Sequence, residues 1–167
     1  AVQSRAIVVD RNTEITVSGD SEISLTTSHD ISLMSGSALN AVDGDITLHA
    51  NQQQSPSTGA FTSITANNAM IETSGTGNIE LHGRAGDEGN GNVGVVLTNG
   101  SVVQSAAMGN SAGTITILGR GGAADSSNIG VVIDGLGTAV RSTDGDIQIT
   151  GFGGTGTDAA NIGVLVH

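Results

Sequence analysis

The sequence predicts a right-handed, single-stranded parallel β-helix (β-solenoid), in which the chain winds through three short strands per coil. Strand-like segments of the same form recur every 32 to 36 residues, and all of them alternate between apolar and polar residues with a period of two. None has the 3.6-residue period of a helix. Aromatic residues make up only 1% of the chain, so the core is expected to be thin and aliphatic.

The first strand of the repeat has the pattern Gly-x-Ile-x-Leu or Gly-x-Ile-x-Ile. Its four copies begin 33, 36 and 32 residues apart, at Gly44, Gly77, Gly113 and Gly145. The Ile and the aliphatic residue two positions later face the same side of a strand, and the opposite phase would bury the polar residues between them. Stacked coils therefore place these side chains in two buried columns. The columns are Ile46, Ile79, Ile115 and Ile147, and Leu48, Leu81, Ile117 and Ile149.

A second strand, which contains Asn-x-Gly-Val, and a third strand of four residues complete the coil. An antiparallel sandwich also has short alternating strands, but it does not require the same residue at the same phase of successive repeats. The recurrence therefore favours parallel coils stacked about 4.8 Å apart. The second strands are expected at 92–97, 128–133 and 161–166, with Val95, Val131 and Val164 lining a second wall, and the third strands at 69–72, 101–104 and 138–141.

The N-terminal part predicts the same coil without insertions. Ile23 lies 23 residues before Ile46, which is the length of three strands with tight corners. Later coils are expanded to 32–36 residues by loops that enter after the first strand and are expected to project from one edge. The chain is thus predicted to be one solenoid segment, 1–167, with short coils at 1–43 and long-loop repeats at 44–167. The short-coil strands are expected at 14–17, 22–25, 30–33 and 38–41, and the loops at 51–59, 84–91, 120–127 and 152–160.

With these repeats in view, the chain resembles the β-helical stalks of filamentous-haemagglutinin-like adhesins and autotransporter passengers. The matching features are Gly-Asp-Ile-x-Leu, Asn-Ile-Gly-Val and Gly-x-x-Val-x-Ser, which together cover about Glu14 to Val166. The resemblance implies secretion, exposure outside the cell or on the bacterial cell surface, and membership of a much larger polypeptide. It carries no catalytic motif.

The charge balance restricts the expected partners. Sixteen acidic residues stand against five Arg, for a net charge of −11, whereas nucleic acid binding needs clustered basic side chains. No apolar run reaches the ~20 residues that cross a bilayer, so no membrane insertion is expected. The last coil stops at His167 without a polar cap. We therefore expect neighbouring coils of a longer chain, or end-to-end or lateral self-association, to cover it, and cell-surface glycans or proteins as further partners.

Two pairs of Asp residues are candidates for a metal site. Asp43 and Asp45 flank one corner Gly, and Asp144 and Asp146 flank another, and calcium prefers such hard oxygens at turns. The coils between the pairs do not repeat the carboxylates, so no acidic ladder forms, and we interpret these residues as turn formers beside Gly. No cofactor is expected, and calcium at these carboxylates is the open alternative.

Two His residues form a second candidate. His49 and His82 both stand five residues after the repeat Gly, so they are expected to be neighbours in an outward column, ~5 Å apart, where two imidazoles can share a transition metal. The column continues as Leu118 and Thr150. We expect no third ligand beside the pair and interpret the two side chains as exposed imidazoles on one surface rung.

Two outward features recur at the second strand. Asn92, Asn128 and Asn161 stand at its entry and are expected to form a structural ladder, because stacked Asn side chains hydrogen-bond between coils. Small and apolar residues alternate on its outward face and are expected to form a flat contact strip, covered either by loops of the same chain or by another molecule. The strip consists of Gly94, Val96, Gly130, Val132, Gly163 and Leu165.

These patterns predict a structural and adhesive function. Polysaccharide lyases and hydrolases need clustered carboxylates in a cleft with stacking aromatic residues, whereas the acids here are dispersed and Trp and Tyr are absent, so no catalytic residues are expected. We expect a rigid rod segment of a large secreted or cell-surface protein that mediates attachment or matrix and filament assembly, and not an enzyme. The alternatives are a carbohydrate-active β-helix with its catalytic residues outside this segment, or in the loops, and a self-assembling filament or sheath subunit.

Overall fold

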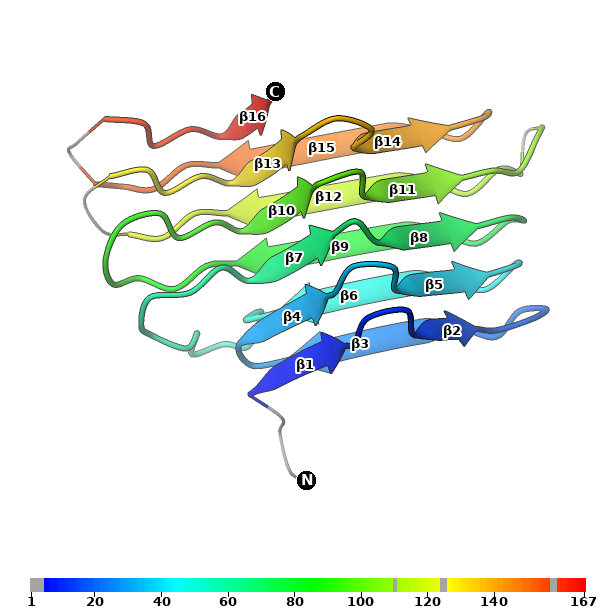
Figure 1. The fold of residues 1–167 in the computed structure, drawn as a ribbon, viewed down its shortest axis with the longest axis horizontal. Coiled ribbons are helices and arrows are strands. Elements are labelled where there is room, and N and C mark those ends of the chain that lie inside the picture. Colours follow the sequence, from blue (N-terminus) through cyan, green and yellow to red (C-terminus); the bar gives the residue numbers. More distant parts are fainter. Residues whose placement is uncertain (1–4, 110, 124–125, 157–158) are drawn as a thin grey trace.

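The computed structural model describes residues 5–109, 111–123, 126–156 and 159–167 of the chain. This part is all-β, and its strands wind into stacked coils whose equivalent strands pair in three parallel sheets (Figure 1). It holds no helix long and apolar enough to cross a membrane. The predicted parallel β-solenoid is confirmed.

Each sheet collects one strand from each coil that contributes to it. Sheet A consists of β1 (Ala6–Val9), β4 (Asp30–Leu33), β7 (Ile64–Asn67), β10 (Val95–Thr98), β13 (Val131–Asp134) and β16 (Val164–Val166). Sheet B consists of β2 (Glu14–Thr16), β5 (Ala38–Ala41), β8 (Met70–Thr73), β11 (Val102–Ser105) and β14 (Ala139–Ser142). Sheet C consists of β3 (Ile23–Thr27), β6 (Ile46–Ala50), β9 (Ile79–Arg84), β12 (Ile115–Arg120) and β15 (Ile147–Phe152).

The register of sheet C confirms the predicted aliphatic columns. Ile115 pairs with Ile79 on one side and with Ile147 on the other, and Ile79 and Ile115 are fully buried. Ile23 pairs with Ile46, so the short N-terminal coil has the expected length. Ile147 is 43% exposed, because β15 is the edge strand of sheet C in the part of the chain that the structure describes.

The core is a narrow aliphatic column enclosed by the three sheets. Along most strands, buried inward residues alternate with half-buried outward ones, as the period of two requires. Among the described residues, the largest fully buried side chains are all Ile or Leu, which agrees with the low aromatic content. They are Ile31, Leu33, Leu39, Ile46, Leu48, Ile64, Ile71, Ile79, Leu81, Leu97, Ile115 and Ile117.

Sheet A contains two strands that the sequence patterns do not reveal, β1 and β7. In β7, Ile64 pairs with Val95, so Ser63 occupies the position that Gly94 holds one coil later. The Asn-x-Gly-Val pattern is therefore missing from this coil, although its strand is present.

The strands of sheet C run further than predicted. Arg84, Arg120 and Phe152 were expected to begin loops, but they are the last residues of β9, β12 and β15. Arg120 pairs with Arg84 on one side and with Phe152 on the other. The ladder continues because each of these residues finds a partner in the next coil, which overrides the loop signal of the Gly before it.

The Gly of the first-strand pattern is required by the stacking of corners. A Cβ atom on Gly113 would collide with the carbonyl oxygen of Gly77, and one on Gly145 would collide with that of Gly113. None of these three glycines has a positive φ. Gly is therefore required here because one coil approaches the next closely, and not because the backbone adopts a conformation that only Gly tolerates.

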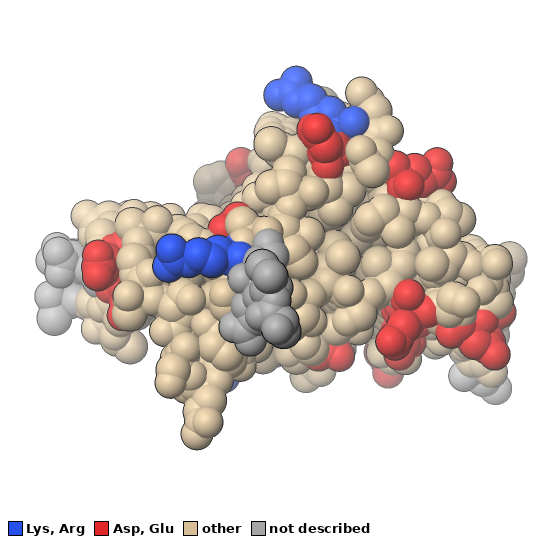
Figure 2. Space-filling model, turned by 90° about the horizontal axis from the view of Figure 1, so that it is seen from below, with Lys and Arg blue, Asp and Glu red and all other residues tan. Residues whose placement is uncertain are grey.

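Charge is spread thinly over the surface. The space-filling view from below shows acidic side chains dispersed around the molecule, with few basic ones and broad uncharged areas between them (Figure 2). This distribution agrees with 16 acidic residues against five Arg. The visible face has no broad basic surface of the kind that binds nucleic acid.

Candidate functional site

The insertions form a stacked flap at one edge of the solenoid, as predicted (Figure 1). We define the flap as the described residues of the loops that join sheet C to sheet A, which are 51–63, 85–94, 121–130 and 153–163. Backbone hydrogen bonds link neighbouring loops: the N–H of Gly86 donates to the carbonyl of Phe61 at 3.0 Å, and that of Gly154 donates to the carbonyl of Asn128 at 2.8 Å. The loops therefore continue the stacking of the coils beyond the sheets.

The base of the flap is a close backbone contact between glycines. A Cβ on Gly119 would collide with the carbonyl oxygen of Gly130, and equivalent collisions relate Gly83 to Gly94 and Gly151 to Gly163. Sheet C and the start of sheet A therefore approach each other without a side chain between them. Gly is required in both layers because a side chain in either would separate them.

This contact buries two Gly residues of the predicted contact strip, while its apolar residues remain partly accessible. Gly94 and Gly130 are buried against the protein's own backbone, whereas Val96, Val132 and Leu165 are half-buried on the outward face of sheet A. The glycine half of the strip thus packs within the chain. The role of the apolar half as a contact surface stays a prediction.

Asn92, Asn128 and Asn161 link successive coils in the flap through bonds from a backbone N–H to a side-chain oxygen. The side-chain oxygen of Asn128 accepts a hydrogen bond from the backbone N–H of Asn92 at 3.0 Å, and that of Asn161 accepts one from Asn128 at 3.1 Å. The Asn92 amide also donates to the carbonyls of Glu88 and Gly89. Each Asn therefore connects its own loop to the next coil, which is a structural role.

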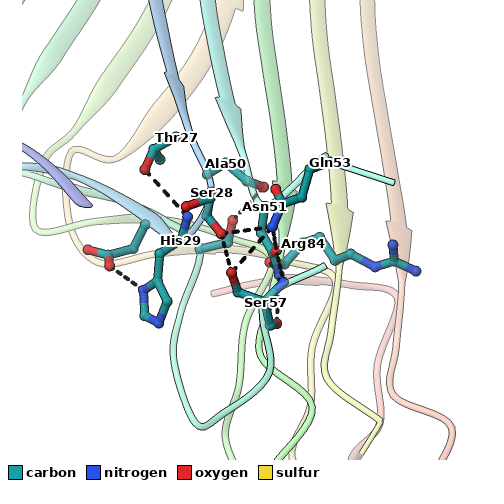
Figure 3. Close-up of polar contacts among 10 residues, drawn as sticks. Thr27, Ser28, His29, Ala50, Asn51, Gln53, Ser57 and Arg84 are labelled. Carbon is teal, nitrogen blue, oxygen red and sulfur yellow. Dashed lines mark hydrogen bonds and ion pairs between the residues drawn. The ribbon is translucent and has the colours of Figure 1, made fainter. Parts of the chain in front are cut away.

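The first flap loop is held by a separate polar network (Figure 3). Asn51, at φ 58°, accepts the N–H of Ser57 at 2.6 Å and donates to the carbonyl of Arg84 at 3.1 Å. Ser57 and Gln53 both donate to the carbonyl of Ser28, at 2.7 and 3.0 Å. The loop is thus fixed to the coil before it and to the coil after it.

A cleft of about 520 Å³ lies along the flap, at the ends of the sheet C strands. Arg84 and Arg120 occupy adjacent rungs in it, and the Arg120 guanidinium lies 4.5 Å from the ring centroid of Phe152. In the part of the chain that the structure describes, neither guanidinium forms an ion pair. Asp87 also lines the cleft, but its Oδ1 accepts the N–H of Gly59.

The structure brings these cleft residues together in a way that the sequence showed only in part. The repeat aligns Arg84, Arg120 and Phe152 at one phase, but it does not show that the Arg120 guanidinium lies over the Phe152 ring or that the flap forms a cleft there. The flap then closes one side of the row. The result is a pair of cations with an apolar platform, which is a typical arrangement for binding an anionic group.

The corner Asp residues act as hydrogen-bond acceptors for a neighbouring coil. Asp43 accepts the N–H of Thr76 at 3.0 Å, Asp45 accepts that of Asn78 at 2.7 Å, and Asp144 accepts that of Gly109. No hydrogen bond to the Asp146 carboxylate is among the described contacts. The arrangement explains why oxygen-bearing side chains recur at this corner, and calcium binding there remains a prediction.

The structure corrects the expectation for His49 and His82, because a third ligand-bearing side chain lies between them. The two residues are paired in β6 and β9, with ring centroids 4.9 Å apart and planes 15° apart. Glu80 stands two residues before His82 on the same face of β9. Its Oε1 lies 2.9 Å from Nε2 of His49 and 3.1 Å from Nε2 of His82.

The sequence contained the signal for this cluster, but along the diagonal of the sheet rather than along a column. Glu80 pairs directly with Thr47, so a search among equivalent positions of successive coils does not find it beside His49. Diagonal neighbours on one face of a sheet are still within reach of long side chains. Burial lowers the pKa of His82, Glu80 opposes this shift, and His49 adds to it.

Comparisons with protein-family models, with curated proteins and with solved structures find no match to this chain. The class of the protein therefore follows from its own architecture. It is a repeat protein of the parallel β-solenoid class, with a stacked flap along one edge.

Proposed function

We propose that this chain is a rigid rod segment of a large secreted or bacterial cell-surface protein, in which it mediates attachment. The observation that carries the proposal is the unbroken register of the three sheets, in which each strand pairs with its equivalent in the next coil. Such stacking buries one continuous aliphatic column and produces length and stiffness. The resemblance to filamentous-haemagglutinin-like adhesins and autotransporter passengers supports the same function.

The flap cleft is the contact site in this proposal. Arg84 and Arg120 are two of only five basic residues in the chain, and they lie on adjacent rungs without a carboxylate partner among the described residues. Guanidinium groups bind carboxylates and sulfates through paired hydrogen bonds, and Phe152 adds an apolar surface for a sugar ring. We therefore assign the carboxylate or sulfate groups of a surface glycan as the ligand class.

The negative charge of the whole chain shapes this interaction. A net charge of −11 repels a polyanion at long range, but the repulsion between exposed charges is screened beyond about 8 Å at physiological salt. Recognition then depends on short-range contacts in the cleft. We expect slow, locally specific binding rather than fast electrostatic capture.

Binding to acidic polysaccharides tests the proposal. Polygalacturonate and heparin are the probes, and the double variant Arg84→Gln/Arg120→Gln is compared with wild type. Arg141→Gln is the matched control, because Arg141 lies on sheet B and donates to Gln104. We expect the double variant to lose binding and the control to keep it.

Three outcomes would contradict this proposal. Equal binding by the double variant would remove the cleft as the contact site. Cleavage of the polysaccharide would favour the carbohydrate-active alternative. Electron micrographs of the purified chain showing long, regular filaments without glycan binding would favour a self-assembling filament or sheath subunit.

A further inference from the structure

The outward face of sheet C carries a three-residue cluster whose members do not line the flap cleft, although His82 stands two residues before Arg84 on the same face of β9. The inference drawn from this cluster does not depend on the proposed attachment function. His49, Glu80 and His82 place one ligand atom each within 4.8 Å of one another. In the part of the chain that the structure describes, this is the only group of three or more His, Cys, Asp or Glu side chains with such spacing. From this convergence we infer that the cluster is a binding site for a divalent transition metal ion, with Zn²⁺ as the best match.

The observed separations fit tetrahedral coordination. Bonds of about 2.0–2.2 Å to imidazole nitrogen and carboxylate oxygen place neighbouring ligand atoms about 3.3 Å apart. The Glu80 Oε1 lies 2.9 Å from Nε2 of His49 and 3.1 Å from Nε2 of His82. These two separations are within a few tenths of an ångström of that value, and the two imidazole ligand atoms lie within 4.8 Å of each other, so ion binding draws the imidazoles together around the carboxylate.

The donor set selects the kind of metal. Two imidazole nitrogens and one carboxylate oxygen suit Zn²⁺ and related transition metals, whereas Ca²⁺ and Mg²⁺ prefer sites made only of oxygen. The three side chains are between 24% and 40% exposed, so solvent water can occupy the fourth position. This arrangement resembles open zinc sites with three protein ligands rather than closed structural ones.

The backbone holds the ligands in place. β9 lies between β6 and β12, so the strand carrying two of the ligands is paired on both sides. The carbonyl of His82 also accepts a hydrogen bond from Gln52 at 3.3 Å.

The ion would connect two coils. His49 belongs to β6, and Glu80 and His82 belong to the next strand of the sheet, β9. Binding to the folded chain alone stabilises it by mass action, so Zn²⁺ is expected to raise the melting temperature.

The test uses the full, untagged chain at neutral pH, with excess Mg²⁺ to suppress loose binding by the acidic surface. Titration calorimetry with Zn²⁺ is expected to show one ion per chain. The variants His49→Gln, Glu80→Gln and His82→Gln should each weaken Zn²⁺ binding by at least about tenfold. Their folding is checked by circular dichroism.

His29→Gln is the matched control. His29 also lies beside a carboxylate, with its Nδ1 2.6 Å from Asp30, but it stacks on Phe61 and has no second imidazole in contact. It should leave Zn²⁺ binding unchanged. In wild type, nitrogen-15 NMR of the imidazoles should show that Zn²⁺ shifts Nε2 of His49 and His82 but not the ring nitrogens of His29.

Any of three results would overturn the assignment: no Zn²⁺ binding by wild type, unchanged affinity in the double variant His49→Gln/His82→Gln, or Zn²⁺-induced shifts confined to other residues. The NMR measurement uses wild type alone, so it tests the metal site even if a variant fails to fold.

Discussion

The backbone N–H of Asn92 donates to the side-chain oxygen of Asn128, one coil away, at a distance of 3.0 Å. Both residues are buried, so no water replaces the acceptor when it is removed. Inside the flap, a side-chain oxygen thus accepts the inter-coil hydrogen bond that a backbone carbonyl accepts in the sheets. The contact gives the first prediction.

Asn128→Ala is expected to destabilise the protein by about 1–3 kcal/mol, because it leaves a buried N–H unsatisfied. The free energy of unfolding measured in urea checks the size of the loss, and hydrogen exchange of the Asn92 amide should accelerate. Asn90→Ala is the control. Asn90 accepts the N–H of Ser126 at 3.2 Å in the same way, but at an exposed position where water can take its place. Equal losses in the two variants would contradict the role of burial.

The corner glycines give a second prediction. Gly113→Ala is expected to cost on the order of 3 kcal/mol, because its Cβ would collide with the carbonyl oxygen of Gly77 and force the coils apart. Urea unfolding measures the change. Gly91→Ala separates this collision from backbone conformation, since Gly91 has φ 75° but open space around its Cβ position. Its expected cost is about 1 kcal/mol. A smaller loss for Gly113→Ala than for Gly91→Ala would argue against close stacking at the corner.

The repeat made most of the solenoid predictable before any coordinates. Ile79, Ile115 and Ile147 stand at one phase of successive repeats, and a period of two assigns them to one face. The same reasoning placed Asn92 and Asn128 on neighbouring coils, because they also recur at one phase. In a solenoid, the residues that stack on one another can be identified from the repeat spacing of the sequence.

Relationships that cross the repeat could not be predicted in this way. Glu80 reaches His49 along a diagonal of sheet C. Gly83 contacts Gly94 across two layers, where the path of the intervening loop decides the distance. These contacts depend on side-chain reach and loop path, which periodicity does not record.

The aliphatic column gives a third prediction. Ile115→Ala should destabilise the chain by about 2–5 kcal/mol, because Ile115 is fully buried and its removal leaves a cavity between two coils. The adjacent outward residue provides the control: Thr116→Ala should cost less than about 1 kcal/mol, since Thr116 is half-buried on the other face of β12. Thermal and urea unfolding measure both. A reversed order of the two losses would contradict the assigned inward face.

The contact strip gives the last prediction. Val132 is half-buried on the outward face of sheet A, between Val96 and Leu165. Because the neighbouring Gly130 packs against the chain itself, we expect Val132→Lys to lower the free energy of unfolding by about 1 kcal/mol without changing the oligomeric state. Thr65→Lys places the same charge in the same column, where Thr65 is already polar, and should have a smaller effect. Light scattering and urea unfolding decide between the two explanations of the strip. Wild-type stability of the Val132→Lys chain, together with loss of an oligomer that light scattering detects for wild type, would show that another molecule, and not the flap, covers the strip.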